Sequence, residues 1–519
     1  MASSRIKAVF GIAGVVFLSK ILGLLREMVI ADRFGTSADY DLYLIAIILP
    51  ALAYGVVNFA SFYLFVPFLT RAFERRENDP DVSGWKAAWP LLNVSLLAAL
   101  AITAVMILGA PWLMKIWAGG FSPEQYETIV FYSRLTALMV VLGTSEAFLR
   151  AVLNVKKIFT YPAAGPIIFN LLSILCIAAL AGKISVGAIA VGLLTGLLAQ
   201  NIYLLFRLIR LKTGKTYRFT FDTGRMKALT ATAGVLLLIE LMNRSYFMID
   251  RYFAPRFGEG IIAALNYSQV LVQLPDAVVG FAIASVLFPL FSRTADESDR
   301  ARFNELYRKA IVAGMLTAAP LAVLFYADAA QIVHLIFYRG VFDFDSLEKT
   351  ARVLRPYTPT IAALFIISTS VRACYGRGWA RSVLWFTVLL LASKFAATAL
   401  LPRWFGYPGI SAATSLSQVG FALLLLALVV RRSRMEAWGR LAGQLVKIAA
   451  AGAVGLAGVL VFERMAGAAL FEGFSRPTAL LKIVLDGVVL AIIYGLLVYF
   501  MGFGEYIKNI LRMKNADAD

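Results

Sequence analysis

Cysteine and histidine are almost absent from this chain of 519 residues, which contains two cysteines and one histidine. Cys176 and Cys374 lie within or at the edge of apolar runs, so the chain has no disulfide framework to read from its spacing. One histidine, His334, leaves too few nitrogen and sulfur ligands for a zinc site. We therefore expect no bound metal and no cofactor.

The chain also lacks the short motifs that mark many enzymes. It contains no HExxH sequence and no nucleophile elbow, and TGKT at 213–216 lacks the earlier glycine of a phosphate-binding loop. The gaps between apolar runs are too short to form a soluble catalytic domain. We therefore expect a protein that is not an enzyme.

Charged residues are scarce, at 16% of the chain, whereas 60% of the residues are hydrophobic. This balance excludes the soluble globular classes. Apolar runs of about 20 residues recur along the chain, and each can cross a hydrocarbon core about 30 Å thick. The pattern predicts an all-α polytopic membrane protein of about 14 transmembrane helices. The predicted spans are 8–31, 41–66, 87–113, 128–150, 160–181, 185–207, 228–250, 261–290, 304–326, 352–373, 382–401, 409–430, 442–462 and 479–501.

Basic residues outnumber acidic ones, 50 to 31, which gives a formal net charge of +19. They lie in the gaps between apolar runs instead of forming one patch, so we expect no nucleic-acid partner. The gaps rich in lysine and arginine follow the even-numbered spans. By the positive-inside rule, both termini and the tail at 503–519 are expected in the cytoplasm.

An internal repeat relates 33–71 to 256–293. Both segments begin with RFG and continue to a Leu-Pro pair, and in both a glycine follows that proline by five positions. Six spans separate the copies, so the two halves have the same orientation and are related by a pseudo-two-fold axis along the membrane normal. The repeat predicts two six-helix lobes, 1–210 and 226–432, plus two C-terminal helices at 441–502.

Such a pair of lobes is the plan of a transporter that works by alternating access. Prolines inside predicted spans remove backbone hydrogen bonds and allow kinks, and neighbouring glycines allow close packing or bending. We expect the hinge positions to be Gly23, Pro50, Gly55, Pro275 and Gly280.

Charges interrupt the first two apolar runs, at Lys20, Arg26 and Asp41. An ionisable group at membrane depth is costly, so it usually faces a partner or a water-filled cavity and marks a functional site. Two interpretations stay open for Arg26 and Asp41, since long side chains near a helix end also reach toward the membrane interface. Lys20 lies too deep in its run to reach the interface easily.

Three stretches resemble the MurJ-type lipid II flippases, a family within the multidrug, oligosaccharidyl-lipid and polysaccharide exporter superfamily. They are SKILGLLREMVIADRFG at 19–35, the segment 247–293 and FYRGVFD at 337–343. The resemblance covers most of the first twelve predicted helices. It implies a membrane transporter of peptidoglycan biosynthesis in the bacterial inner membrane, which moves a polyprenyl-diphosphate-linked precursor from the inner to the outer leaflet.

The same resemblance implies a cationic cavity for the diphosphate, with Lys20, Arg26 and Asp41 at matching positions, and a groove for the lipid tail at 441–502. We expect lipid-linked glycan and membrane lipids as partners, and a monomer. The chain departs from the family at Tyr54 and at Ser268-Gln269-Val270, where the family has arginines. Arg244 and Arg251 are candidate replacements.

These departures leave a second substrate class open, another polyprenyl-diphosphate-linked oligosaccharide of the exopolysaccharide or O-antigen type. A cation-coupled drug antiporter is a third alternative, because Glu146, Asp276 and Asp486 fall in apolar runs. Some family members resemble sodium-coupled transporters. Here Lys394 stands about where an amide ligand is expected, and we hypothesise that it pairs with Glu240 as an internal counter-ion. The alternative is that the Lys394 side chain reaches toward the outer surface of the membrane. Coupling to the membrane potential or to a monovalent cation is consistent with either arrangement.

Overall fold

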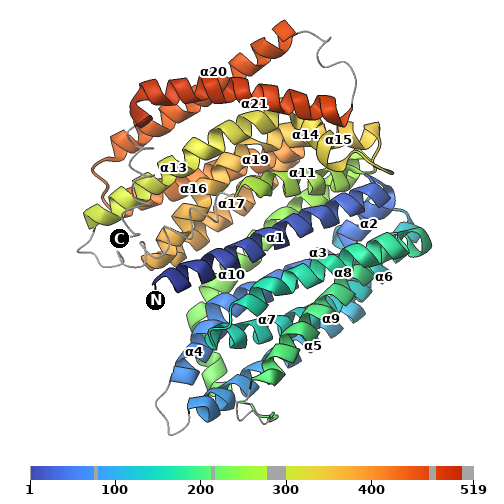
Figure 1. Cartoon of the computed structure of the whole chain (residues 1–519). Coiled ribbons are helices and arrows are strands. Elements are labelled where there is room, and N and C mark those ends of the chain that lie inside the picture. The colour runs from blue at the N-terminus through green and yellow to red at the C-terminus, as the bar shows by residue number, and fades with distance from the viewer. Residues whose placement is uncertain are drawn as a thin grey trace. The chain divides into compact units, whose positions relative to one another are not determined.

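The computed structural model describes residues 2–74, 80–211, 217–221, 223–276, 300–466 and 475–504. Within these ranges the regular elements are helices, apart from one isolated bridge between Arg339 and Phe342. The prediction of an all-α chain is confirmed (Figure 1). The described residues form two compact units, 1–263 together with 339–342, and 264–338 together with 343–519.

The described residues of the first unit form ten α-helices. A π-helical segment, Ser61–Phe65, joins the third helix to the fourth. The helices are α1 (Ala2–Phe34), α2 (Ala38–Ala46), α3 (Ile48–Ala60), α4 (Val66–Glu74), α5 (Pro80–Leu113), α6 (Pro123–Ala137), α7 (Met139–Val155), α8 (Thr160–Ile184), α9 (Gly187–Arg210) and α10 (Thr223–Phe253).

The second unit begins within the helix that follows α10. That helix, α11 (Ile261–Pro275), is the last element before the gap at 277–299. The helices after the gap are α13 (Arg300–Ala327), α14 (Ala329–Phe337), α15 (Phe344–Tyr357), α16 (Pro359–Gly376), α17 (Ala380–Leu400), α18 (Pro402–Phe405), α19 (Pro408–Arg432), α20 (Trp438–Ala466) and α21 (Arg476–Val498).

Among the described residues, ten helices are long and apolar enough to cross a membrane. Large apolar side chains on these helices are exposed, such as Leu108 at 72% and Trp385 at 69%, because lipid is their natural surrounding. The multi-pass prediction is therefore confirmed, although the count of about 14 is not. The four other predicted spans overlap α1, α10, α11 and the α15–α16 pair, and positions 277–290 of the span predicted at 261–290 lie outside the described residues.

The second predicted span is not one continuous helix. α2 ends at Ala46 and α3 begins at Ile48, with Pro50 in the first turn of α3. Proline has no N–H to donate to the carbonyl of the preceding turn, so an interruption at this place has a direct cause. Pro275 stands at the end of α11. Gly280 lies outside the described residues, and the hinge roles of these positions stay predictions.

Aromatic residues of α5 and α7 belong to a hydrophobic core of the first unit. Trp85 and Trp89 stack with ring centroids 4.8 Å apart, and Trp89 lies 6.5 Å from the ring of Phe148. Leu204 of α9 and Leu69 of α4 complete this buried cluster. The core fixes the helices against which α8 and α1 pack.

The lobes predicted at 1–210 and 226–432 divide the chain at a different place from the two compact units. The predicted first helix of the second lobe, α10, packs on α3 within the first unit. The pair α20–α21 lies in the second unit, where both helices pack on α13 (Figure 1). The symmetry of the lobes and the tail groove at 441–502 stay predictions.

Helices α8 and α9 approach each other closely at glycines of α9 (Figure 1). A Cβ atom on Gly196 would lie 2.7 Å from the backbone oxygen of Phe169, which is closer than packed atoms allow. Glycine is the residue that permits such an approach between membrane helices. Because α8 also packs along α1, this contact positions α8 beside the charged part of α1.

We predict that Gly196→Ala lowers the stability of the folded protein by about 1–3 kcal/mol, since the added methyl forces α8 away from α9. The measurement is the thermal unfolding midpoint in detergent. Gly182→Ala is the matched control, because no atom lies within 4 Å of a Cβ at Gly182. Equal midpoints for the two variants would contradict the packing argument.

Candidate functional site

The two cations of α1 differ in their surroundings. Lys20 is exposed, whereas the side chain of Arg26 is 26% exposed. The Nη2 atom of Arg26 lies 2.8 Å from Oε1 of Glu27, and its Nη1 atom donates to Oδ1 of Asn170 at 3.3 Å. The guanidinium also lies over the ring of Phe169, 5.4 Å from the centroid. Arg26 is therefore held by an anion, an amide and an aromatic face.

Glu27 and Asn170 were missed in the sequence analysis. Glu27 follows Arg26 directly in an apolar helix, and its side chain is 12% exposed. An acidic residue at such a depth is itself a signal of a buried ion pair. Asn170 gives a weaker signal, as one amide within the apolar run of α8. It also donates to the backbone oxygen of Ser19 at 3.3 Å, which ties α8 to α1 at the residue directly before Lys20.

Asp41 lies on α2 and is 3% exposed. One carboxylate oxygen accepts a hydrogen bond from the N–H of Gly260 at 2.6 Å, and the other accepts from the N–H of Ala263 at 2.8 Å. These N–H groups belong to the start of α11, where a helix leaves its first donors unsatisfied. Asp41 therefore caps α11 from a different helix, and its predicted role in substrate binding stays a prediction.

Two further contacts join the same part of α2 and the end of α1 to distant segments. Nη1 of Arg251 donates to the backbone oxygen of Leu44 at 2.6 Å. The N–H of Val341 donates to the backbone oxygen of Asp32 at 2.9 Å. We call these contacts, together with those of Asp41, the α1–α2 contact cluster.

Glycines with positive φ make this cluster possible. Gly260 has a φ of +81°, and a Cβ atom there would clash with the backbone of Thr36. Gly340 has a φ of +54° and lies equally close to the backbone of Asp32. A side chain at either place would force the chain away from α1 and α2, because both the backbone conformation and the available space demand glycine.

Arg244 lies on α10 with its side chain 51% exposed, and its Nε atom contacts Oε1 of Glu240 at 2.7 Å. It packs against Gly55, where a Cβ atom would lie 2.7 Å from that Nε. Gly55 therefore makes room for Arg244. Tyr54, which stands where the resemblance leads us to expect an arginine, also packs against a glycine. Its ring fills the space above Gly143.

Glu146 is 1% exposed and is already engaged by polar neighbours. Nε2 of Gln200 donates to its Oε1 at 3.1 Å, and Nε of Arg150 lies 3.6 Å from the same atom. Arg150 also donates to Oδ1 of Asn58. A carboxylate with these partners is a weak candidate for carrying a cation.

Lys394 of α17 is completely buried. Its Nζ atom contacts Oγ1 of Thr414 and lies 3.4 Å from the backbone oxygen of Ile410, both on α19. Glu240 belongs to the first compact unit and Lys394 to the second. Their pairing as counter-ions stays a prediction.

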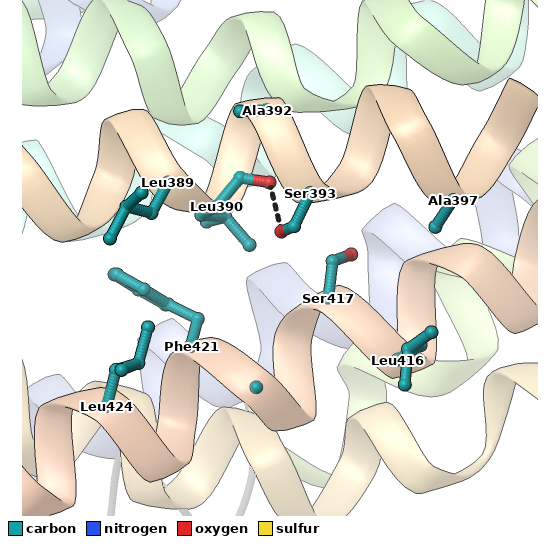
Figure 2. Close-up of a pocket in the computed structure, with 10 residues that line it drawn as sticks. Leu389, Leu390, Ala392, Ser393, Ala397, Leu416, Ser417, Phe421 and Leu424 are labelled. Atoms are coloured by element: carbon teal, nitrogen blue, oxygen red, sulfur yellow. Dashed lines mark hydrogen bonds between the residues drawn. The ribbon is translucent and has the colours of Figure 1, made fainter.

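A cavity of about 410 Å³ lies between α17 and α19 (Figure 2). One of its lining residues, Ser393, directly precedes Lys394 in the sequence. Leu389 and Leu390 of α17 face Phe421 and Leu424 of α19 across it. Ser393 uses its hydroxyl to donate to the backbone oxygen of Leu390 at 2.9 Å. Because no charged side chain lines this cavity, it suits an apolar chain and not a diphosphate.

Carboxylates within the described residues gather in one group that could hold a metal ion. Asp328, Glu463 and Asp486 place their oxygens within 4.8 Å of one another. The ammonium of Lys482 contacts all three carboxylates. The cation position of this group is therefore taken by a side chain.

The family model and the similar proteins carry the same family name. The family model described as lipid II flippase MurJ matches residues 30–476. A Burkholderia cenocepacia protein named lipid II flippase MurJ is 25% identical over 382 residues, covering 72% of this chain and 73% of that protein. A Vibrio cholerae protein named probable lipid II flippase MurJ is also 25% identical, over 87% of this chain and 88% of that protein.

Solved structures agree with the fold. A lipid II flippase MurJ in an inward closed conformation superposes with a TM-score of 0.78 at 18% identity, covering 95% of this chain and 99% of that chain. An inward-facing multidrug resistance transporter of the MATE family gives a TM-score of 0.66 at 16% identity, over 82% of this chain and 95% of that chain.

We predict that Asp41→Ala destabilises the folded protein by about 1–2 kcal/mol, because it removes the cap from two N–H groups of α11. Asp41→Asn keeps one acceptor oxygen and is expected to lose less. Thermal unfolding in detergent measures both changes. Asp39→Ala, an exposed acidic position on the same helix, is the control. An Asp41→Ala variant as stable as this control would show that the cap is energetically unimportant.

Proposed function

The chain belongs to the MurJ family of lipid II flippases, and on that premise we propose that it carries lipid II from the inner to the outer leaflet. The family is one of transporters, and its members are multi-pass proteins of the bacterial inner membrane. The single observation that carries the proposal is the pair of cations on α1, with exposed Lys20 and half-buried Arg26 on one membrane helix.

The physical reason is the charge of the substrate. A diphosphate that crosses a bilayer needs cationic partners in a wet cavity, because hydrocarbon does not solvate phosphate. Arginine binds phosphate oxygens in pairs, and lysine adds a mobile point charge. Six residues on a helix separate Lys20 from Arg26 by about 9 Å, which two phosphates and their bridging oxygen can span with flexible side chains.

Arg26 has an anionic neighbour, Glu27, at 2.8 Å. We propose that the diphosphate takes over part of this pairing while Asn170 and Phe169 keep the guanidinium oriented. Arg244 is half exposed beside Glu240 and serves as a third cation. Arg251 contributes less to binding, since its Nη1 atom is held by the backbone oxygen of Leu44.

Alternating access is the mechanism that we propose for the movement. We propose the α1–α2 contact cluster as one closure of the cavity. Its four hydrogen bonds join the ends of α1 and α2 to the end of α10, to the start of α11 and to residues 339–342. Opening on that side requires these bonds to break together. The positive-inside pattern assigns this closure to the outer side, with both termini in the cytoplasm.

We propose apolar helix surfaces as the path of the lipid tail. The pair α20–α21 presents exposed apolar side chains such as Val461 and Ile492. The cavity between α17 and α19 is a second apolar site of suitable chemistry (Figure 2). We expect the protein to work as a monomer with no cofactor, and to couple to the membrane potential or to a monovalent cation.

Tyr54 favours a second candidate substrate, another polyprenyl-diphosphate-linked oligosaccharide. Its ring lies against Gly143 where the family resemblance leads us to expect an arginine. The lost cation changes contacts to the headgroup without removing the α1 pair that binds diphosphate. A drug antiporter is less well supported, because Glu146 is paired with Arg150 and Gln200.

We predict that Arg26→Ala lowers lipid II flipping at least about tenfold, since a charge-assisted hydrogen bond contributes about 1.5–3 kcal/mol. Arg26→Lys keeps the charge and is expected to retain partial activity. The assay follows lipid II accessibility in the outer leaflet of cells in which the native flippase has been depleted. Arg33→Ala is the matched control, because Arg33 is an exposed residue of the same helix. Full activity of a well-expressed Arg26→Ala variant would refute the diphosphate-binding role.

The same depleted host also tests the substrate. We predict that the unmodified chain restores growth and outward movement of lipid II, in a manner that depends on Lys20 and Arg26. If the protein is folded in the membrane and lipid II stays in the inner leaflet, the substrate is another lipid-linked glycan. Tyr54→Arg would then be expected to move the specificity toward lipid II.

A further inference from the structure

A buried ionic cluster joins α20 and α21 to the turn between α13 and α14. Nζ of Lys482 lies 2.7 Å from Oδ1 of Asp328 and 2.8 Å from Oδ2 of Asp486, and it also contacts Oε1 of Glu463. Asp328 and Asp486 are completely buried. We call these four residues the Lys482 cluster. They come from three separate segments and play no part in the diphosphate site proposed above.

The charges of the cluster do not balance. With all groups ionised, three carboxylates face one ammonium. Glu463 is 24% exposed, whereas Asp328 and Asp486 are completely buried, so one buried negative charge is left without a balancing positive charge. An uncompensated buried charge is strongly destabilising, so such a group takes up a proton or binds a cation. Lys482 alone supplies only one of the positive charges that the carboxylates require.

Two oxygen atoms of the cluster give an independent sign of a missing partner. Oδ2 of Asp328 and Oδ1 of Asp486 have no hydrogen-bond partner within the residues described by the structure. Both atoms are buried, where an ionised carboxylate oxygen is costly unless it accepts a hydrogen bond. A carboxylic acid differs, because its proton turns one such oxygen into a donor for the other carboxylate.

The geometry excludes a metal ion at the centre of the cluster. A metal needs several oxygens around one point, and the ammonium of Lys482 holds that point with contacts to all three carboxylates. A proton needs no such space. We propose that the Lys482 cluster is a proton-binding site, in which Asp328 and Asp486 share one proton beside the charged Lys482.

Other titratable and charged groups lie on the helices packed against the Lys482 cluster. Buried His334 of α14 stacks on Tyr338 with ring centroids 4.6 Å apart, and Arg476 at the start of α21 donates to the backbone oxygen of Tyr338 at 3.4 Å. Tyr326 of α13 and Arg464 of α20 are exposed. A test must therefore separate the carboxyls of the cluster from His334.

Release of the proton leaves a second negative charge between α21 and the α13–α14 turn. Like charges in a buried place repel, so loss of the proton favours separation of these segments. Binding of the proton holds α20 and α21 in place. The site thus links the position of this helix pair to proton concentration, and this link does not depend on which lipid the protein carries.

Infrared spectroscopy of the full-length protein in nanodiscs tests the proposal directly. A protonated carboxylic acid has a carbonyl stretching band that ionised carboxylates lack. We expect such a band at neutral pH, where ordinary aspartates are ionised, and we expect it to vanish in alkaline buffer. It should be lost in Asp486→Asn and in Asp328→Asn, and it should persist in His334→Gln. Asp345→Asn, at an exposed ion pair with Lys349, is the matched control.

The outcomes are distinct. No band in the unmodified protein at neutral pH overturns the proposal, and this measurement requires no variant to fold. A band that survives both Asn substitutions also overturns it, because the proton then belongs to another group. Loss of the band in Asp486→Asn alone, or in Asp328→Asn alone, supports the site and identifies the carboxyl that carries the proton.

Thermal unfolding adds a second readout. If the folded state binds one more proton than the unfolded state, the unfolding equilibrium shifts by up to about tenfold per pH unit, toward the unfolded state as pH rises. The unmodified protein should therefore lose stability with rising pH, whereas Asp486→Asn should show a flatter profile. The same measurement at constant pH can compare sodium with choline as the buffer cation. If sodium raises the stability and choline does not, the cluster binds a metal ion instead of a proton, and the proposal is refuted.

Discussion

The cost of charge in a membrane is the constraint on which the rest of this structure depends. Hydrocarbon offers no water to solvate an ion, so each buried charge needs a partner within reach. Arg26 finds Glu27 as the next residue of its own helix, and Arg150 finds Glu146 one turn earlier. Lys482 finds three carboxylates from three segments. A helix that carries a buried charge must therefore supply the opposite charge itself or lie next to a segment that supplies it.

The same constraint acts on the backbone. Helix ends leave N–H and C=O groups unsatisfied, and within a membrane a protein group must supply the missing partner. Asp41 does this for α11 with both carboxylate oxygens, and Arg251 does it for the carbonyl of Leu44. These few hydrogen bonds join segments that are far apart in the sequence. A transporter that opens at such a place has to exchange these bonds for others, which makes closure specific without a large apolar interface.

The architecture was largely predictable from the sequence, whereas the partners of the charged residues were not. Apolar runs of sufficient length revealed the spans, and Pro50 marked the interruption between α2 and α3, because both are properties of a local stretch of chain. Asp41 was recognised as a costly charge, but the N–H groups that it caps lie more than 200 residues away, and no local pattern points to them. The count of about 14 spans stays a prediction, because ten helices among the described residues are long and apolar enough to cross a membrane. Asn170 was missed for the same reason as the partner of Asp41, since an isolated amide in an apolar helix gives no indication of which charge it will meet.

The pairing of Arg26 with Glu27 also bears on the empty carrier. In the proposed cycle the protein returns without substrate, and an unpaired guanidinium would then remain at membrane depth with the full cost of its charge. Glu27 offsets that charge when the diphosphate is absent, so the empty and loaded states differ less in electrostatic energy than the charge of Arg26 alone would imply. In the proposed cycle the diphosphate binds Arg26 by replacing one anion with another, and we expect this exchange to limit the affinity for the substrate and to allow its release on the far side.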